Sequence, residues 1–145
     1  MMTAPETIIA RNREIVRKIY EIADRGAGTE HEQYMAEHGQ FMSADYSLTQ
    51  APGHPVPGHW NGPDADAAIA RVFQACGNTG ITVREIVADG PHRVIGLVDA
   101  HGTAQDGTPW TMPVAECFWI DDGKVTDIRP YYWDLVELRR IAGLA

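Results

Sequence analysis

The sequence predicts an α+β protein: a cone-shaped, curved antiparallel sheet wraps three helices, and a short helix follows at the C-terminus. Helical periodicity dominates the first half of the chain, and a meander of four long strands is expected from Ile81 onward. Asp-Gly pairs separate these strands at Asp89-Gly90, Asp106-Gly107 and Asp122-Gly123. Such pairs favour tight hairpin turns because glycine adopts positive φ without a steric cost. A further strand, residues 41–49, precedes the meander.

Size and charge restrict the class of protein. We expect a single domain over residues 1–145, which is long enough to bury a core. The formal net charge of -8 repels nucleic-acid backbones and anionic membranes, so neither is expected as a partner. No secretory signal pattern begins the chain, and no apolar run approaches the roughly 20 residues that span a bilayer. A cytoplasmic location is therefore expected, with Cys76 and Cys117 as reduced core thiols, although a disulfide between them stays open.

The helices are recognised from their ends. A capping box with proline in the first turn begins the first helix, which is amphipathic and runs over residues 3–26. The capping-box pattern Thr29-Glu30-His31-Glu32 begins a second helix that ends at Gly39. A third is expected over residues 62–77, and a short C-terminal helix begins at a capping box in residues 134–137.

A carboxyl group interrupts an apolar row in the last hairpin, residues 110–134. By the two-residue period of a strand, Glu116 shares a face with Met112, Val114, Phe118 and Ile120. Burying a lone carboxylate is costly, so this side chain must be paired, protonated, or placed at a wet cavity.

These segments together resemble a known fold family. The helix of residues 12–25, the Pro- and Gly-rich loop into Trp60-Asn61-Gly62, and the hairpin VAECFWIDDGKVTDIRPYYWD resemble the nuclear transport factor 2-like superfamily, particularly its SnoaL-like and ketosteroid-isomerase-like branches. The resemblance covers nearly the whole chain and implies a cone with a small-molecule pocket. The superfamily includes isomerases, cyclases, dehydratases, epoxide hydrolases and binding modules, so the fold alone does not assign the reaction.

Comparison with ketosteroid isomerases gives Glu116 a role. It falls where those enzymes keep a protonated carboxylic acid that donates a hydrogen bond to the substrate oxyanion. Their general base falls near Gln50-Ala51-Pro52, where this chain has no acid, and their oxyanion tyrosine falls near Ile19, one residue from Tyr20. The resemblance therefore does not imply steroid isomerisation itself.

Comparison with limonene-epoxide hydrolases gives Asp99 a role. It matches the acid of their Arg-x-Asp pair, but Leu97 replaces the arginine and the second aspartate becomes about Pro130. This chain therefore lacks both the arginine and the second aspartate of those enzymes, which argues against their mechanism.

The register of the last hairpin leaves two alternatives for Glu116. A strict two-residue turn places Arg129 opposite Glu116 as an ion pair. A three-residue loop of residues 121–123 instead places Ile128, Pro130 and Tyr132 on the Glu116 face, and the family resemblance favours this register.

A pair of carboxyl groups is the catalytic hypothesis. Asp99 shares a strand face with Leu97 and His101, and Glu116 lies on the adjacent strand. If the acids converge, Glu116 stays protonated as the acid, Asp99 serves as the base, and His101 relays the proton. The alternative is a structural pairing of Asp99 and His101 with each other or with Arg93.

Aromatic and histidine side chains complete the expected pocket. His54 and Trp60, with His59, are placed at its mouth, and no histidine spacing typical of metal ligands and no nucleotide-binding motif occurs, so neither metal nor cofactor is expected. The predicted pocket residues are Tyr20, Tyr46, His54, Trp60, Leu97, Trp110, Phe118 and Tyr132.

We therefore expect a cofactor-independent acid/base enzyme of isomerase, lyase (dehydratase) or cyclase type that acts on a small, mostly apolar cyclic or aromatic metabolite. The alternatives are an epoxide hydrolase of the limonene-epoxide-hydrolase type and a non-catalytic small-molecule-binding module. A homodimer through the outer face of the sheet is expected because Trp119 and Tyr131 point outward, with Arg129 near the interface.

Overall fold

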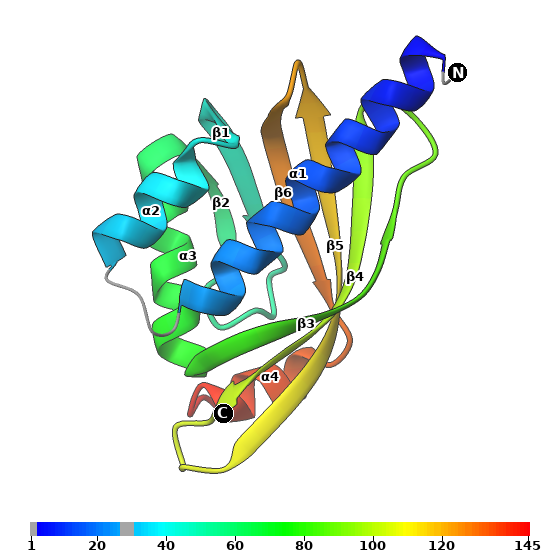
Figure 1. The fold of residues 1–145 in the computed structure, drawn as a ribbon. Helices are drawn as coiled ribbons and strands as arrows, with labels where there is room; N and C mark the ends of the chain where they lie inside the picture. Colours follow the sequence, from blue (N-terminus) through cyan, green and yellow to red (C-terminus); the bar gives the residue numbers. More distant parts are fainter. Residues whose placement is uncertain (1–2, 27–30) are drawn as a thin grey trace.

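The computed structural model describes residues 3–26 and 31–145 (Figure 1). In this part of the chain, helices and strands follow one another as the sequence predicts, apart from one additional short strand. The elements are α1 (Ala4–Gly26), α2 (His31–Gly39), β1 (Met42–Gln50), β2 (Gly58–Asn61), α3 (Gly62–Cys76), β3 (Asn78–Val87), β4 (Arg93–Thr103), β5 (Pro109–Asp121), β6 (Lys124–Tyr132) and α4 (Leu135–Ile141). The additional strand is β2, which ends the Pro- and Gly-rich segment.

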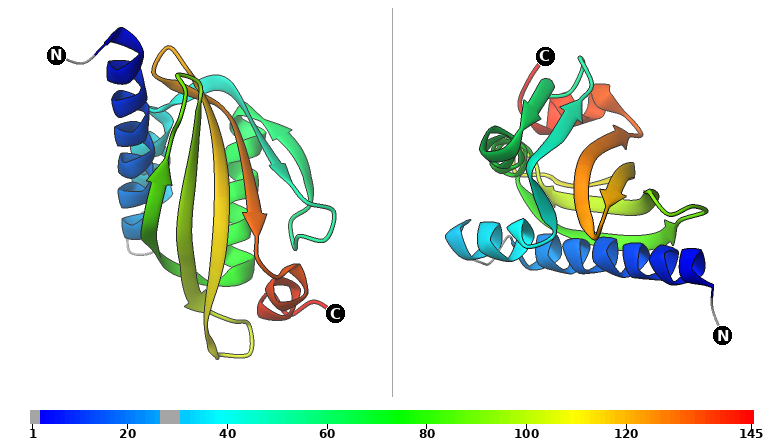
Figure 2. Two further views of the ribbon diagram at one scale, coloured as in Figure 1. Left: turned by 90° about the vertical axis from the view of Figure 1, so that its right-hand side faces the viewer. Right: turned by 90° about the horizontal axis from the view of Figure 1, so that it is seen from above.

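The strands form one curved, unclosed sheet in the order β2-β1-β6-β5-β4-β3. Neighbouring strands are antiparallel except β1 and β6, which run parallel. The long strands twist and curl around an interior that α1 bounds on one side and α3 on another (Figure 2). The predicted α+β class with a cone-like sheet is confirmed.

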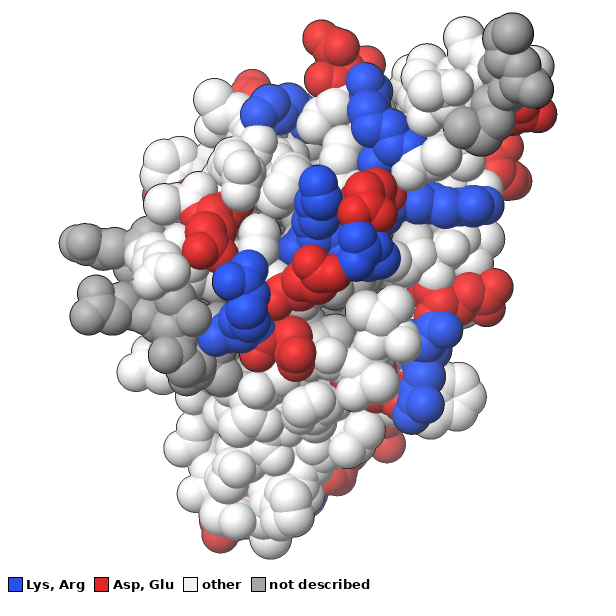
Figure 3. All heavy atoms as spheres, viewed as in Figure 1, with Lys and Arg blue, Asp and Glu red and all other residues white. Residues whose placement is uncertain are grey.

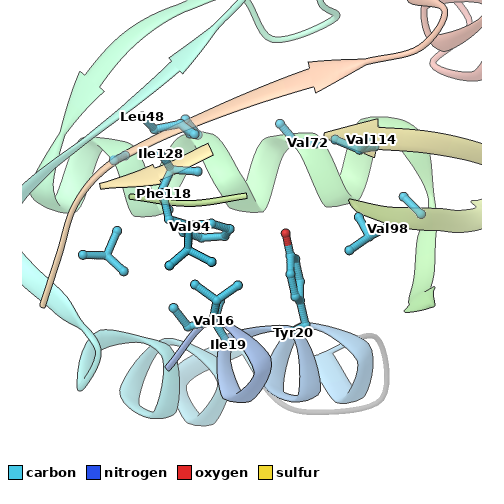
Figure 4. Packing of buried hydrophobic residues seen from close by; sticks show 14 of the residues in the cluster. Val16, Ile19, Tyr20, Leu48, Val72, Val94, Val98, Val114, Phe118 and Ile128 are labelled. Atoms are coloured by element: carbon cyan, nitrogen blue, oxygen red, sulfur yellow. The ribbon is translucent and has the colours of Figure 1, made fainter. Parts of the chain in front are cut away.

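The core fills the concave, inner face of the sheet. Along β4, Val94, Gly96, Val98 and Ala100 are buried, and the residues between them are only half-buried. Figure 4 shows Val16, Ile19 and Tyr20 of α1 pointing toward the strand residues of this face. The amphipathic stripe of α1 therefore packs on the sheet, as its periodicity predicts.

Charged side chains cover the exposed side of α1. Figure 3 shows acidic and basic groups interspersed there, and Arg17 forms ion pairs with Glu14 and Glu21. None of the helices in residues 3–26 and 31–145 is long and apolar enough to cross a membrane.

The helix ends follow the predicted capping chemistry where the structure describes them. At α1, the Thr3 backbone N–H donates to Glu6 Oε2 at 2.7 Å, and the Glu6 N–H donates to Thr3 Oγ1 at 3.3 Å. At α4, Asp134 accepts from the Glu137 backbone N–H at 3.0 Å. The capping box predicted at residues 29–32 begins outside the described residues.

The hairpin of β5 and β6 has the predicted register, but a two-residue turn and a β-bulge produce it instead of the predicted three-residue loop. Its turn has two residues, not three, because Asp122 (φ 47°) and Gly123 (φ 77°) form a type I′ turn that joins Asp121 to Lys124. A β-bulge at Thr126 then shifts the pairing by one residue.

The shifted register decides what lies on the Glu116 face. Glu116 pairs with Pro130, whereas Arg129 pairs with Cys117 and is exposed. The alternative of a Glu116–Arg129 ion pair is therefore wrong. Ile128, Pro130 and Tyr132 share the inner face with Glu116, as the favoured register predicts. Cys76 and Cys117 are both free thiols.

Gly77, the C-cap of α3, connects this helix to β3 at a position where the Thr103 backbone leaves no room for a side chain. It adopts φ 61°, and an added Cβ would lie 2.0 Å from the Thr103 carbonyl oxygen, whereas a Cβ at Gly90 meets nothing within 4 Å. We expect Gly77→Ala to lower the free energy of unfolding by more than about 2 kcal/mol, and the control Gly90→Ala to change it by less than about 0.5 kcal/mol. Urea denaturation measures both, and equal effects would contradict the constraint.

Candidate functional site

A cavity lies between the inner face of the sheet and helices α1, α2 and α3. It contains about 100 Å³ of free space, enough for several water molecules. Most of its wall is apolar, including Val98, Val114 and Phe118. The polar side chains on the wall are Tyr20, Tyr34, His38, Gln50, Asn78, Glu116 and Tyr132, and the indole of Trp110 also contributes.

Glu116 is the acid on this wall. Burial among apolar side chains raises the pKa of its carboxyl group to about 7, and the hydrogen bond from Tyr20 opposes this shift. Near neutral pH both the protonated and the ionised forms are therefore populated. A carboxyl group in this range can both donate and accept a proton, which is the property that acid/base catalysis requires.

Tyr20 reaches Glu116 from the opposite wall. Its hydroxyl donates to Glu116 Oε1 at 3.0 Å, and its ring packs edge-to-face on Phe118 with centroids 5.8 Å apart. Figure 4 shows this side chain projecting from α1 with its hydroxyl directed into the interior. Burial, followed by the nearby Glu116 charge, raises the pKa of the Tyr20 hydroxyl, so Tyr20 stays a hydrogen-bond donor.

Gly96 makes this approach possible. It lies directly opposite Glu116 on the neighbouring strand β4. A Cβ at this position would stand 2.0 Å from the Tyr20 hydroxyl oxygen. Only glycine therefore leaves room for the tyrosine hydroxyl beside the carboxyl group.

Tyr132 is a second phenol on the wall. Burial, followed by the Glu116 charge, raises the pKa of its hydroxyl, and the Gln50 side chain opposes this shift. The ring of His54 packs against the Tyr132 ring with centroids 4.8 Å apart. His54 Nδ1 accepts a hydrogen bond from the Val56 N–H at 2.9 Å, and burial lowers its pKa to about 4, so this imidazole is neutral.

His38 and Tyr34 of α2 form the polar part of another wall. Their rings stack with centroids 5.5 Å apart. Burial lowers the pKa of His38 to about 4, so its imidazole is also neutral near pH 7. Tyr34 and His38 were not predicted from the sequence, because the weak amphipathic pattern of residues 31–39 does not identify which side faces the interior.

The predicted convergence of Asp99 and Glu116 is wrong. Because strand side chains alternate, burial of Val98 and Ala100 places Leu97, Asp99 and His101 on the outer face of the sheet. Asp99 and Leu97 line an open groove of about 410 Å³ on that outer face.

Asp99 and His101 have structural partners there. Arg84 Nε donates to Asp99 Oδ2 at 2.6 Å, so the expected structural pairing occurs with Arg84 rather than with His101 or Arg93. His101 Nδ1 lies 3.3 Å from Thr79 Oγ1.

Three other predicted pocket residues do not line the cavity. Tyr46 is buried and donates to Asp66 Oδ1 at 2.6 Å, which ties β1 to α3. Trp60 lies beneath the Arg71 guanidinium, 5.5 Å from the ring centroid. His54 is wholly buried behind Tyr132 rather than at a mouth.

The structure places Glu116 and four of the predicted pocket residues on the cavity wall: Tyr20, Trp110, Phe118 and Tyr132. Gly96, Gln50 and Asn78 complete the site without having been predicted as functional. In the described part of the chain, no three His, Cys, Asp or Glu side chains are grouped as metal ligands would be.

The curved sheet and its helices have the nuclear transport factor 2-like fold. The model of the SnoaL-like domain family matches residues 16–128. The chain belongs to the SnoaL-like domain family. Comparison with curated proteins returns no significant match.

Solved structures share the fold at low sequence identity. Bal32a, from a soil-derived mobile gene cassette, is 20% identical, with a TM-score of 0.75 over 89% of this chain and 94% of its own. A candidate SnoaL-like polyketide cyclase from Jannaschia sp. CCS1 is 18% identical, with a TM-score of 0.73 over 100% and 99%. TerC co-crystallised with polyporic acid is 19% identical, with a TM-score of 0.73 over 92% and 98%.

The raised pKa of Glu116 predicts a pH dependence of stability. Since the pKa rises from 4.5 to about 7 on folding, the folded state binds more protons than the unfolded state between these values. Stability conferred by the protonated carboxyl is full below pH 4.5 and is lost as the pH rises to about 7.

Glu116→Gln, which mimics the protonated form, should therefore match wild type at pH 4.5 and exceed it at pH 8 by on the order of 3 kcal/mol. Denaturation at both pH values measures the difference. The control Glu85→Gln, at an exposed position of β3, should show no such divergence. Parallel pH curves for wild type and Glu116→Gln would contradict the buried carboxyl.

Proposed function

We propose that the protein is a cofactor-independent acid/base enzyme of isomerase, lyase or cyclase type, acting on a small, mostly apolar cyclic metabolite. The observation that carries the proposal is Glu116, a carboxyl group with a pKa of about 7 that accepts a hydrogen bond from Tyr20 inside an apolar cavity. Membership of the SnoaL-like family supports small-molecule binding or an isomerase- or cyclase-type function.

The chemistry follows from the two protonation states of one group. Ionised Glu116 accepts a proton from a carbon next to a substrate carbonyl, and the electron pair of the broken C–H bond moves into an enolate. Protonated Glu116 then returns the proton to the same or another carbon, and the carbonyl re-forms. Because Asp99 lies outside the cavity, Glu116 performs both steps.

The phenols would stabilise the charge that develops on oxygen. Tyr20 and Tyr132 are both held as neutral donors, since the pKa of each hydroxyl is raised by burial and by the Glu116 charge. A donor placed in an apolar cavity stabilises an enolate oxygen more strongly than the same donor in water. Tyr20 also favours the ionised form of Glu116, which is the form that accepts the proton.

A non-catalytic binding module is the second candidate. It is favoured by one observation: Glu116 is the sole carboxyl group on the cavity wall among the described residues. The epoxide hydrolase alternative needs an acid network at Asp99, which instead pairs with Arg84 on the outer face. Relatives described as a candidate polyketide cyclase and as a complex with polyporic acid favour a small organic ligand over a purely structural role.

Proton transfer can be measured without the natural substrate. Wild-type protein should catalyse deuterium uptake from D2O, or double-bond migration, in a panel of small cyclic β,γ-unsaturated ketones, followed by NMR. Glu116→Gln should lower the rate by roughly 10²-fold or more, whereas Asp99→Asn should react like wild type because Asp99 lies outside the cavity.

Tyr20→Phe supplies an independent readout. Removing the Tyr20 hydrogen bond raises the pKa of Glu116, so the pH–rate profile should move to higher pH. A wild-type protein that exchanges no deuterium with any ketone would contradict catalysis and favour the binding module. Loss of activity in Asp99→Asn alone would contradict the assignment of Glu116.

We also propose a homodimer through the outer face of the sheet. Tyr131 and Trp133 are 54% and 82% exposed, and they border the outer groove together with Leu97 and Pro113. Aromatic side chains are enriched in protein–protein interfaces relative to the rest of the surface. The cytoplasmic location stays a prediction from the sequence.

Sedimentation at micromolar concentration should give a dimer, and Tyr131→Glu with Trp133→Glu should shift it to monomer. Ala10→Glu, on the exposed side of α1, serves as the matched control and should stay dimeric. A wild-type protein that sediments as a monomer would remove the proposal.

A further inference from the structure

The cavity wall carries no positive charge in the described part of the chain. Among its lining residues there is no Lys or Arg, and the sequence of residues 27–32, AGTEHE, contains none. A ligand carboxylate or phosphate would thus be buried without a counter-ion and beside Glu116. Burial of an unpaired negative charge is strongly unfavourable, so the ligand is not an anion.

The cavity wall also holds hydrogen-bonding capacity that the protein does not use. Five buried side-chain polar atoms lack a partner in the described residues, and three belong to cavity residues: His38 Nδ1, Gln50 Oε1 and Asn78 Oδ1. His38 and Gln50 are only 3% and 5% exposed, so bulk water does not satisfy them. Buried polar groups are normally hydrogen-bonded, and a partner for these three can come from the cavity they line.

These groups are distributed between the entrance and the interior. Ala23, Phe73, Asn78 and Ile81 are half-buried and also line a small adjoining depression, which marks where the cavity approaches the surface. Gln50 lies deeper, beside Tyr132. Figure 3 shows that the surface below α1, over the start of β3 and the β4–β5 hairpin, carries almost no charged side chains. An uncharged molecule therefore meets no charged barrier on this side.

We infer that the cavity binds a non-anionic, hydroxyl-bearing ring compound, whose hydroxyl groups pair with the amides of Gln50 and Asn78 while another oxygen faces Glu116. The free volume of about 100 Å³ is smaller than the roughly 150 Å³ of a cavity that holds benzene, so one ring is the upper limit and its entry requires side chains to move. This inference rests on the proposed function, since both place the ligand in the same cavity. It excludes carboxylates and phosphates, and it distinguishes a hydroxylated ring from a plain hydrocarbon ring.

Three one-ring probes separate these classes: resorcinol (two hydroxyl groups), toluene (none) and benzoate (charged). Binding is measured by calorimetry at pH 6, where Glu116, with its pKa of about 7, is mostly protonated and does not itself repel benzoate. Wild-type protein should bind benzoate at least roughly tenfold more weakly than resorcinol. Equal affinities for benzoate and resorcinol would overturn the inference, and this comparison needs no variant.

Variants then assign the hydrogen bonds. Gln50→Leu and Asn78→Leu should each weaken resorcinol binding by roughly tenfold, about 1.4 kcal/mol, and leave toluene binding unchanged or stronger. Gln33→Leu, the same substitution at an exposed site of α2, is the matched control and should change neither. Parallel losses for resorcinol and toluene in both cavity variants would overturn the inference, and thermal unfolding verifies that each variant is folded.

The binding and activity experiments can contradict the ligand class and the proposed function independently. If Glu116→Gln retains deuterium exchange while resorcinol shows the expected pattern, the ligand class stands and the proposed function fails. If exchange depends on Glu116 but benzoate binds like resorcinol, the function stands and the ligand class fails.

Discussion

The hydrogen bond between Tyr20 and Glu116 is the contact on which the electrostatics of the interior depend. This bond joins α1 to the middle of the sheet across a mostly apolar space. Burial raises the pKa of the Glu116 carboxyl group, and the hydrogen bond from Tyr20 lowers it. Its geometry requires a glycine at position 96, because any Cβ there would occupy the place of the tyrosine hydroxyl. Tyr20 of α1, Glu116 of β5 and the glycine at position 96 of β4 therefore act together to set the pKa of this carboxyl group at about 7.

A single extra residue in β6 determines the neighbours of that carboxyl group. Without the bulge at Thr126, the two-residue turn would place Arg129 opposite Glu116, and a cation at that position would favour the ionised form and lower its pKa. With the bulge, Pro130 lies opposite, and Tyr132 joins the cavity wall. Bulges re-aim side chains in this way in many functional sheets. The electrostatics of the site are thus set by strand register.

The ionisable groups on the two faces of the sheet have different partners. On the outer face, Asp99 pairs with Arg84 at an accessible position, where such a pair contributes little to stability. On the inner face, Glu116 has a neutral donor and no cation, so its proton affinity stays high. The curved sheet thus keeps one carboxyl group on its inner face apart from the charged groups on its outer face.

The sequence alone determined the local features: the helix caps at Thr3 and Asp134, the order of elements, the meander and the inward face of β5, including Glu116. Capping and two-residue alternation depend on near neighbours, so they are readable without the fold. Only the tertiary structure decided which face of β4 points inward, because Asp99 and His101 alternate with small apolar residues and either assignment leaves a plausible strand. The bulge at Thr126, the space at Gly96 and the inward turn of His38 likewise depend on packing between elements distant in sequence, which no local pattern encodes.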